Sequence, residues 1–475
     1  MEPTRILLFV FLIHSLRKLT VLSYNILVLP RPVYSHVRSV KVMMDILINE
    51  YQHNITLLLT DSVAKHPSLK DIRAEIVTYD KDGKFTKNLD ELSSKAYENG
   101  FNSMGPLSMV PYIQSMAVGF THSIMTDSEI YNKLEGHYSG IPEFPVFPLL
   151  DTTSFFSRLK NVGVRMGLSL VGCFSEYVIY PKDIVHRYVS TTNLDKFYKL
   201  ANGFSLYLLD QDGILDYPRP VLSNIVPVGG LALSDIVHPL PMEIQRHVDT
   251  AHDGFVVATF GSTLKTTLEE FRKKLYQAFK NIPKIHFVLK IGETYFQDKN
   301  ILQTPWVPQN DLLGNKRVKA FITHCGNSGQ YEALYHGVPM VAIPIFGDQV
   351  YNADRIVMKS FGVKLDLVAF TSGDLEKSIR EVVYNDTYSR KIKLASEMYR
   401  SKPQNASQRA AYWVHHVTTY GSVHLRSPSH SLPAYKYLAL DVVLFVFLCF
   451  LLLLGAVVTG VCVLCRFCCS IQKKF

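Results

Sequence analysis

Residues 306–352 read WVPQNDLLGNKRVKAFITHCGNSGQYEALYHGVPMVAIPIFGDQVYN, and this stretch decides the fold. It contains two strand–loop–helix units in succession. Residues 318–323 form a short apolar run typical of a buried parallel strand, and a small glycine-containing turn and a helix to about His336 follow. Gly337-Val338-Pro339 predicts the end of that helix, and residues 340–343 predict the next strand. This order predicts an α/β fold with parallel strands.

The turn between the first strand and its helix suits a phosphate group. A helix start offers unpaired N–H groups and the positive end of the helix dipole, and Gly326 permits close approach of the backbone. Ser328 and Glu332 are four positions apart and share one helix face, where the carboxylate is placed to accept from ribose hydroxyls. Trp306 offers a stacking surface for a base, and Gln309 offers a donor and an acceptor for the base edge.

The same stretch resembles the signature of the UDP-glycosyltransferase family, which includes the glucuronosyltransferases. The segments that match in order and spacing are Trp306-Val307-Pro308-Gln309, Thr323-His324-Cys325-Gly326, Glu332, Gly337-Val338-Pro339-Met340 and Asp348-Gln349. One departure is that Asn327-Ser328-Gly329 stands where many members have another residue, then Asn or Gly, then Ser. The competing interpretation is a generic parallel-sheet unit whose loop polar groups are satisfied internally.

The resemblance implies a role for each matching residue. Trp306 and Gln309 would hold the uracil, and Glu332 would hold the ribose. The diphosphate would contact His324, Gly326 and Ser328, joined by Ser262 from a Gly-Ser turn after the strand at residues 254–260. The sugar hydroxyls would bind Asp348 and Gln349. We expect no metal and no cofactor beyond the UDP-sugar donor, because helix amides and His324 can carry the diphosphate charge.

Composition excludes several other classes of protein. The 475 residues are 47% hydrophobic, which suggests a globular protein with membrane segments. The net charge of +9 is spread thinly, without the basic run that would form a nucleic-acid face. Five of the seven cysteines lie between Cys449 and Cys469, so the body holds neither a disulfide framework nor a zinc motif. Lipid-facing or acylated thiols fit the C-terminal cysteines better.

Both ends of the chain predict membrane targeting. Residues 1–23 resemble a signal peptide, with a charged start and a short apolar segment. Residues 442–465 carry no charge and would span about 36 Å as a helix, enough to cross a bilayer. The basic tail at residues 466–475 predicts a cytosolic end and a single-pass type I topology with the bulk in the lumen. Sequons at Asn54, Asn385 and Asn405 are compatible with lumenal exposure, and the resemblance implies the endoplasmic reticulum membrane.

The first part of the chain begins as a strand–helix–strand unit. We expect strands at residues 25–29, 54–60 and 74–79, with a loop through His36 and a helix after the first strand. This loop lies at the carboxyl end of the first strand, where such sheets bind ligands. The resemblance implies that His36, in Tyr34-Ser35-His36, is the general base toward the acceptor hydroxyl. The alternative is a helix-start histidine that merely caps or faces solvent.

The family's base histidine is oriented by an aspartate at the end of a later strand, and that strand is not found here. About one βα unit, on the order of 30 residues, is missing after Glu135. Two candidates for the aspartate remain open. Asp127 lies in the capping box Thr126-x-x-Glu129, which favours helix capping as its role. Asp151 is the other candidate.

These observations predict two facing doubly wound Rossmann-like lobes of the GT-B type, plus one C-terminal transmembrane helix. Residues 24–228 would bind a small lipophilic acceptor and residues 229–425 the UDP-sugar, with a terminal helix at residues 403–420 bracing the first lobe. The predicted activity is inverting transfer of glucose or glucuronic acid to a hydroxyl group. The alternative is a catalytically silent, membrane-anchored relative that binds UDP-sugar and partners active members, in homo- or hetero-oligomers. A sugar-nucleotide epimerase fits a lumenal, anchored chain poorly.

Overall fold

The computed structural model describes residues 23–28, 34–65, 69, 71–79, 154–156, 159, 163, 206–216, 221, 223–261, 269–291, 297–345, 348–425, 432–437 and 439–472. The predicted signal peptide, the region around Glu135, Asp127, Asp151, Ser262 and the last three residues lie outside the described residues. Met1–Ser422 and Val423–Phe475 form two separate compact units.

The larger sheet of the first unit has the strand order β12-β11-β10-β6-β7-β9-β8 in the part of the chain that is described. All neighbouring strands run parallel except β8 and β9. The strands are β6 (Phe255–Thr259), β7 (His286–Lys290), β8 (Gln297–Asp298), β9 (Ile301–Gln303), β10 (Val318–Thr323), β11 (Met340–Ala342) and β12 (Gly362–Lys364). Every residue of β6 is buried, as expected for a central parallel strand.

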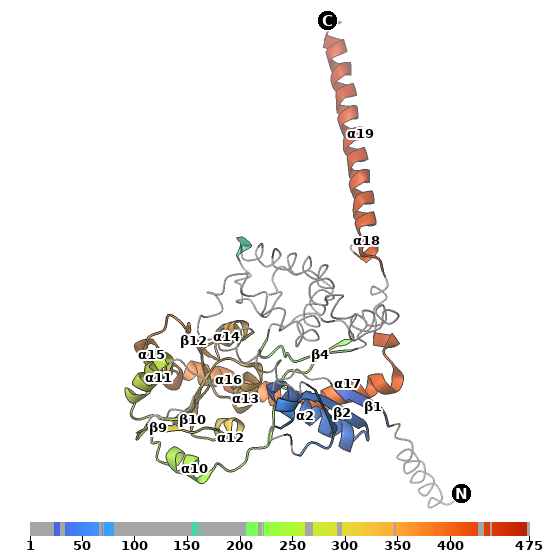
Figure 1. Ribbon diagram of the computed structural model, residues 1–475. Helices are drawn as coiled ribbons and strands as arrows, with labels where there is room; N and C mark the ends of the chain where they lie inside the picture. Colours follow the sequence, from blue (N-terminus) through green and yellow to red (C-terminus); the bar gives the residue numbers. More distant parts are fainter. Residues whose placement is uncertain are drawn as a thin grey trace, which may run out of the picture. The chain divides into compact units, whose positions relative to one another are not determined.

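Successive residues of β6 face two different cores. Phe255 and Val257 belong to one apolar cluster, and Val256 and Ala258 belong to another. The first cluster includes residues of α10 (Met242–Asp249), α13 (Asn327–His336), α14 (Gln349–Met358) and α16 (Asp386–Arg400). The second includes residues of α11 (Glu269–Lys280) and α15 (Ser372–Tyr384). The sheet is therefore covered by helices on both faces, as a doubly wound fold requires (Figure 1).

A topological switch point lies between β6 and β10. The chain runs from β6 to β7 and on to β9 on one side, and then returns to place β10 on the other side of β6. Thr323 at the end of β10 is in register with Thr259 at the end of β6. Because ligands of open α/β sheets bind at such a point beyond the carboxyl ends of the strands, this edge is where a site is expected.

The first part of the unit holds a smaller parallel sheet. Among described residues it contains β1 (Asn25–Val28), β2 (Asn54–Thr60) and β3 (Glu75–Tyr79), with β4 (Tyr207–Leu209) and β5 (Ile225–Pro227) forming a separate parallel pair. The helices α2 (Tyr34–Asn49) and α3 (Asp61–Ala64) follow β1 and β2. The prediction of parallel α/β sheets is confirmed.

The helix α17 (Ala406–Tyr420) returns from the second lobe to the first. Its Ala410 and Ala411 are fully buried in the same cluster as Val37 and Leu47 of α2, and Figure 1 shows the two helices side by side. His415 of α17 lies 3.0 Å from His53, measured between ring nitrogens. This helix lies where the bracing helix was expected, and its first residue is Ala406 rather than Pro403.

The second unit ends in one long apolar helix. The elements of this unit are η4 (Val423–Leu425), α18 (Ala434–Tyr437) and α19 (Leu440–Gln472). Residues Leu440–Leu464 have a mean hydropathy of 3.1 and are long enough to cross a bilayer. This helix contains the predicted span at residues 442–465.

One expectation about local structure was wrong. His36 lies within the first turn of α2 rather than in the preceding loop, because the helix begins at Tyr34. Two short strands that the sequence did not indicate are also present, because residues 298–303 contain part of β8 and all of β9. Strands of two and three residues are too short to leave a hydrophobic period in the sequence.

Candidate functional site

The turn between β10 and α13 is built by local hydrogen bonding. The Oγ1 of Thr323 accepts a hydrogen bond from the N–H of Cys325 at 3.1 Å, and Cys325 has a left-handed φ of 68°. Gly326 is the N-cap of α13, and its extended backbone (φ −61°, ψ 140°) leads into the helix without a side-chain cap. The amides of the first helical turn therefore lack the side-chain acceptor that usually satisfies them, which suits an anion.

His324 lies between two glycines. A Cβ atom would lie 2.7 Å from its Nε2 if placed on Gly326 and 2.9 Å if placed on Gly261, so only glycine leaves room for the ring at either position. Burial lowers the pKa of His324 to about 4. The imidazole is therefore neutral at pH 7, and it can contribute hydrogen bonding to a bound group.

Four polar side chains form a continuous chain across the carboxyl edge of the sheet. The fully buried Glu332 accepts from Arg38 Nη2 at its Oε1 (2.7 Å) and from Gln309 Nε2 at its Oε2 (2.6 Å). The Oε1 of Gln309 accepts from the hydroxyl of Thr259 at 2.5 Å. The structure thus places Gln309 against the predicted ribose carboxylate, with both ends of its amide engaged, rather than alone toward a base edge.

The loop after β11 is tied to the turn after β10. Asp348 accepts from Asn352 Nδ2 at 2.7 Å, and the same amide nitrogen donates to the carbonyl of Cys325 at 3.0 Å. Gln349 is the first residue of α14 and is buried. Its Oε1 accepts a hydrogen bond from the N–H of Ile345 at 2.9 Å. The predicted sugar-binding pair therefore lies on a loop that shares hydrogen bonds with the predicted phosphate turn.

A network around the buried Arg355 contacts the start of α13, next to the turn after β10. Sequence reasoning missed this network. Arg355 and Asp216 are each 1% exposed and are paired at 2.7 Å. Arg355 also donates to Asn327 Oδ1 at 2.6 Å and to Gln330 Oε1 at 2.8 Å. Asn327 in turn donates to the side chain of Asp210 at 3.1 Å. Arg355 is the one cation of α14, but the mixed sequence of that helix gave no signal that it is buried, and its partners lie far away along the chain.

The remaining predicted residues divide into those the structure describes and those it does not. Trp306 is 62% exposed, so its ring is accessible for stacking. Gly326 and Ser328 are half-buried at the start of α13. The backbone of His36 lies in α2, two residues before Arg38, while its side chain and all of Ser262 lie outside the described residues.

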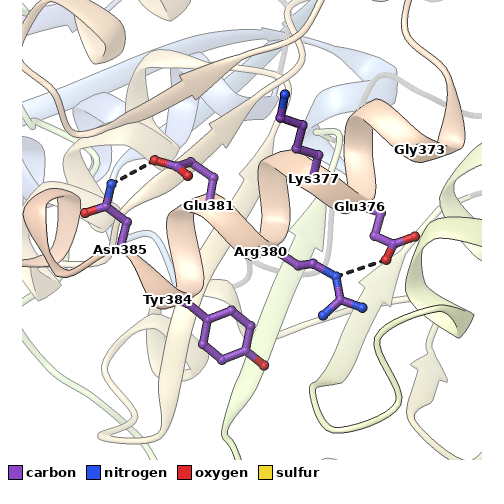
Figure 2. A pocket seen from close by; sticks show the side chains of 7 residues that line it. All are labelled: Gly373, Glu376, Lys377, Arg380, Glu381, Tyr384 and Asn385. Atoms are coloured by element: carbon purple, nitrogen blue, oxygen red, sulfur yellow. Dashed lines mark hydrogen bonds and ion pairs between the residues drawn. The ribbon is translucent and has the colours of Figure 1, made fainter.

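A surface hollow seen in Figure 2 belongs to a different part of the molecule. It is lined by the outer face of α15 and its end, from Gly373 to Asn385. Within it, Arg380 donates to Glu376 at 2.9 Å and Asn385 donates to Glu381 at 2.8 Å. Because these groups satisfy each other and none belongs to the polar chain around Glu332, we assign the hollow no role in ligand binding.

Three partly buried histidines predict a loss of stability on acidification. Burial lowers the pKa of His247, His324 and His336 to about 4 each. In an unfolded chain these groups titrate near pH 6.5, so between pH 6.5 and 4 the unfolded state binds more protons than the folded state. The midpoint of thermal unfolding of the full chain in detergent should therefore fall as the pH drops from about 6.5 to 4. The midpoint of the variant His336→Gln should fall less steeply with pH, because unfolding of this variant takes up as much as one proton fewer.

The exposed His252 provides the matched control for this experiment. Its substitution His252→Gln should leave the pH dependence of the unfolding midpoint as in the parent chain. Equal slopes for the parent, His336→Gln and His252→Gln would contradict the prediction.

Comparisons with known proteins agree with this geometry. The family model of UDP-glucoronosyl and UDP-glucosyl transferases matches residues 113–475. The chain is 32% identical over 393 residues to rat 2-hydroxyacylsphingosine 1-beta-galactosyltransferase, covering 78% of this chain and 70% of the relative. It is 30% identical over 369 residues to human UDP-glucuronosyltransferase 1A1, covering 74% of this chain and 67% of the relative.

Solved structures show the same fold at low sequence identity. The crystal structure of Os79 from O. sativa in complex with U2F and trichothecene aligns with a TM-score of 0.53 and 14% identity, covering 83% of this chain and 99% of that one. The glycotransferase of kitacinnamycin aligns with a TM-score of 0.51 and 18% identity, covering 83% and 98%. These likenesses confirm the predicted GT-B-type fold.

Proposed function

This chain belongs to the UDP-glycosyltransferase family, and from that premise we propose that it transfers a glycosyl group from a UDP-sugar to the hydroxyl group of a small lipophilic acceptor, with inversion. The observation that carries the proposal is the polar chain at the switch point of the larger sheet. There Glu332, on the helix α13 that follows the uncapped turn at Gly326, accepts a hydrogen bond from Gln309, the first residue of α12 (Gln309–Leu313). The carboxyl edge of the larger sheet thus carries both a carboxylate suited to the ribose and helix amides suited to the diphosphate.

The donor would be held by groups that differ in chemistry along its length. The Trp306 ring would stack on the uracil, and Glu332 with Gln309 would accept and donate to the ribose hydroxyls. The amides at the start of α13 and the N–H of neutral His324 would stabilise the diphosphate. Asp348 and Gln349 would contact the sugar. In support of this arrangement, Trp306 and Gln309 follow β9 in the chain, His324 and Glu332 follow β10, and Asp348 and Gln349 follow β11.

The proposed reaction requires a base on the opposite side of the sugar from UDP. His36 would take the proton of the acceptor hydroxyl while the acceptor oxygen forms a bond to the anomeric carbon. The bond between that carbon and the UDP oxygen breaks, and UDP leaves with the electron pair. Attack from the face opposite to the leaving group inverts the anomeric centre. The negative charge that develops on the β-phosphate is stabilised by the first-turn amides of α13.

The acceptor class and the cellular location are inferred from relatives and from the apolar helix α19. One relative acts, by its name, on a 2-hydroxyacylsphingosine, which is a lipophilic hydroxyl compound. A helix able to cross a bilayer would keep the protein close to such compounds. We propose a single-pass protein of the endoplasmic reticulum membrane whose two lobes lie in the lumen.

The proposed function is tested by measuring UDP release from membranes that contain the full chain. UDP-glucose, UDP-glucuronic acid and UDP-galactose are each offered with phenols, steroids and a 2-hydroxyacylsphingosine; galactose is included because of the named relative. Acceptor-dependent UDP release, with an inverted product, is the expected result. Binding of UDP without release from any donor would reject the enzyme and support a silent UDP-sugar-binding relative.

The stacking role of Trp306 gives a separate prediction. Trp306→Ala should weaken UDP binding by about tenfold or more, because base–aromatic stacking contributes roughly 1–3 kcal/mol per base. Trp306→Phe, which keeps an aromatic face, should lose less affinity for UDP than Trp306→Ala. The ring is 62% exposed, so neither variant should lower the unfolding midpoint appreciably. Titration of the full chain with UDP measures the effect, and equal affinity in Trp306→Ala and the parent chain would remove Trp306 from the site.

A further inference from the structure

An ion pair joins α2 of the first lobe to α13 of the second lobe at the candidate site. The Nη2 of Arg38 donates to Oε1 of Glu332 at 2.7 Å, although the two residues are 294 positions apart in the chain. The Arg38 side chain is 39% exposed and that of Glu332 is 1% exposed. A pair with one buried member differs from an ordinary surface pair, because the buried carboxylate depends on its partner for compensation.

The contacts of Glu332 leave it able to bind a further ligand. Each carboxylate oxygen has two acceptor positions, and Arg38 and Gln309 use one on each oxygen. The second position on each oxygen can accept a hydroxyl of a vicinal diol such as that of ribose. Arg38 and Gln309 therefore fix the plane of the Glu332 carboxylate and leave one acceptor position on each oxygen for a ligand.

The position of Arg38 on its helix connects the pair to the proposed base. Arg38 lies in α2 two residues after His36, so both belong to the start of the same helix. One bond thus joins the segment that carries the proposed base to the carboxylate that would hold the donor ribose. A substitution of Arg38 would change the positions of His36 and Glu332, although Arg38 itself does not contact the reacting atoms.

We propose that Arg38 is a positioning residue of the donor site, supplied by the acceptor lobe, which orients Glu332 for the ribose diol and holds the start of α2 against the donor lobe. The inference rests on the proposed function, since it takes Glu332 as the ribose-binding group. The Arg38–Glu332 bond would then affect both donor recognition and the placement of the base. Removal of the guanidinium should impair both ribose discrimination and turnover.

The test compares binding of UDP and 2′-deoxy-UDP to the full chain in detergent. The parent chain should prefer UDP by roughly ten- to hundredfold, as expected for a hydroxyl that donates to a charged group. Arg38→Met should reduce this preference at least fivefold, and Arg38→Lys should retain part of it. The matched control is Lys41→Met, which removes a positive charge one turn along α2 that pairs with Asp45 of the same helix at 3.2 Å. This control should leave the preference unchanged.

A second readout is turnover at saturating UDP-sugar. Arg38→Met should lower kcat about tenfold or more, because the start of α2 loses its bond to Glu332, while Lys41→Met should keep the parent value. An equal loss of affinity for UDP and 2′-deoxy-UDP in Arg38→Met, or an unchanged preference, would overturn the proposal and assign Arg38 a structural role only. A parent chain that binds UDP without discriminating against 2′-deoxy-UDP would also overturn it.

The failure of the proposed function gives a different pattern. A parent chain that binds UDP with the expected preference but shows no turnover with any donor rejects the transferase, while the effect of Arg38→Met on the preference still supports the positioning role. A parent chain that binds neither nucleotide rejects the donor site and the Arg38 proposal together. Thermal midpoints of Arg38→Met and Arg38→Lys are measured alongside to confirm that each variant is folded.

Discussion

Replacing His36 by alanine is expected to lower glycosyl transfer by about 10²- to 10⁴-fold, the contribution typical of a general base. The acceptor hydroxyl must lose its proton as its oxygen attacks the sugar, and alanine offers no acceptor for that proton. UDP binding should stay close to that of the parent chain, because the proposed donor contacts come from the second lobe. The effect should therefore fall on kcat and be measured with saturating UDP-sugar.

Two controls separate loss of the base from loss of structure. Added imidazole should restore part of the activity of His36→Ala, since a free base can enter the space of the missing ring. The exposed His252→Ala should behave as the parent chain does. Unchanged turnover in His36→Ala would show that another group is the base. A parent chain that is itself inactive but binds UDP would instead favour the silent relative.

The second large effect is expected at the buried arginine of α14. Arg355→Met should destabilise the protein by about 3–5 kcal/mol, because it leaves the buried charge of Asp216 without a partner. It also removes the donor to the buried Gln330 and the partly buried Asn327, so two more polar groups lose a hydrogen bond. At roughly 2–4 °C per kcal/mol for a domain of this size, the unfolding midpoint should fall by about 10 °C.

The chain offers a matched exposed ion pair for comparison. Arg380, with a side chain 45% exposed, pairs with Glu376 on the outer face of α15, and Arg380→Met should change the midpoint little. The double variant Arg355→Met with Asp216→Leu should be less destabilised than the sum of the two single variants, because no buried charge remains unpaired. If Arg355→Met and Arg380→Met had the same midpoint, the buried network would contribute nothing to stability.

The central strand and helix of the site could be predicted from the sequence to the residue. Residues 318–323 and the helix end at His336 match β10 and α13, because an apolar run bounded by glycines leaves few alternatives. The start of α2 was placed too late, since Pro30 and Pro32 favoured a longer loop. The short strands β8 and β9 were missed because they have no period to detect.

The contacts that organise the site could not be predicted in the same way. Arg38 and Glu332 are 294 positions apart, and Arg355 and Asp216 are 139 apart, so no local pattern connects them. Gln309 looked available for a base edge, yet the register of β6 and β10 places Thr259 within reach of its amide oxygen. Only the folded chain shows that a residue of the first lobe completes the surroundings of Glu332.

The return of α17 to the first lobe has a consequence for biosynthesis. Ala410 and Ala411 complete a core that begins with Val37, yet the ribosome makes them some 370 codons later, on the order of tens of seconds at typical translation rates. Until then the part of the apolar face of α2 that α17 covers stays exposed, so the nascent first lobe should depend on chaperones. A premature stop codon before Ala406 would leave that lobe unfinished even though its own strands had all been translated.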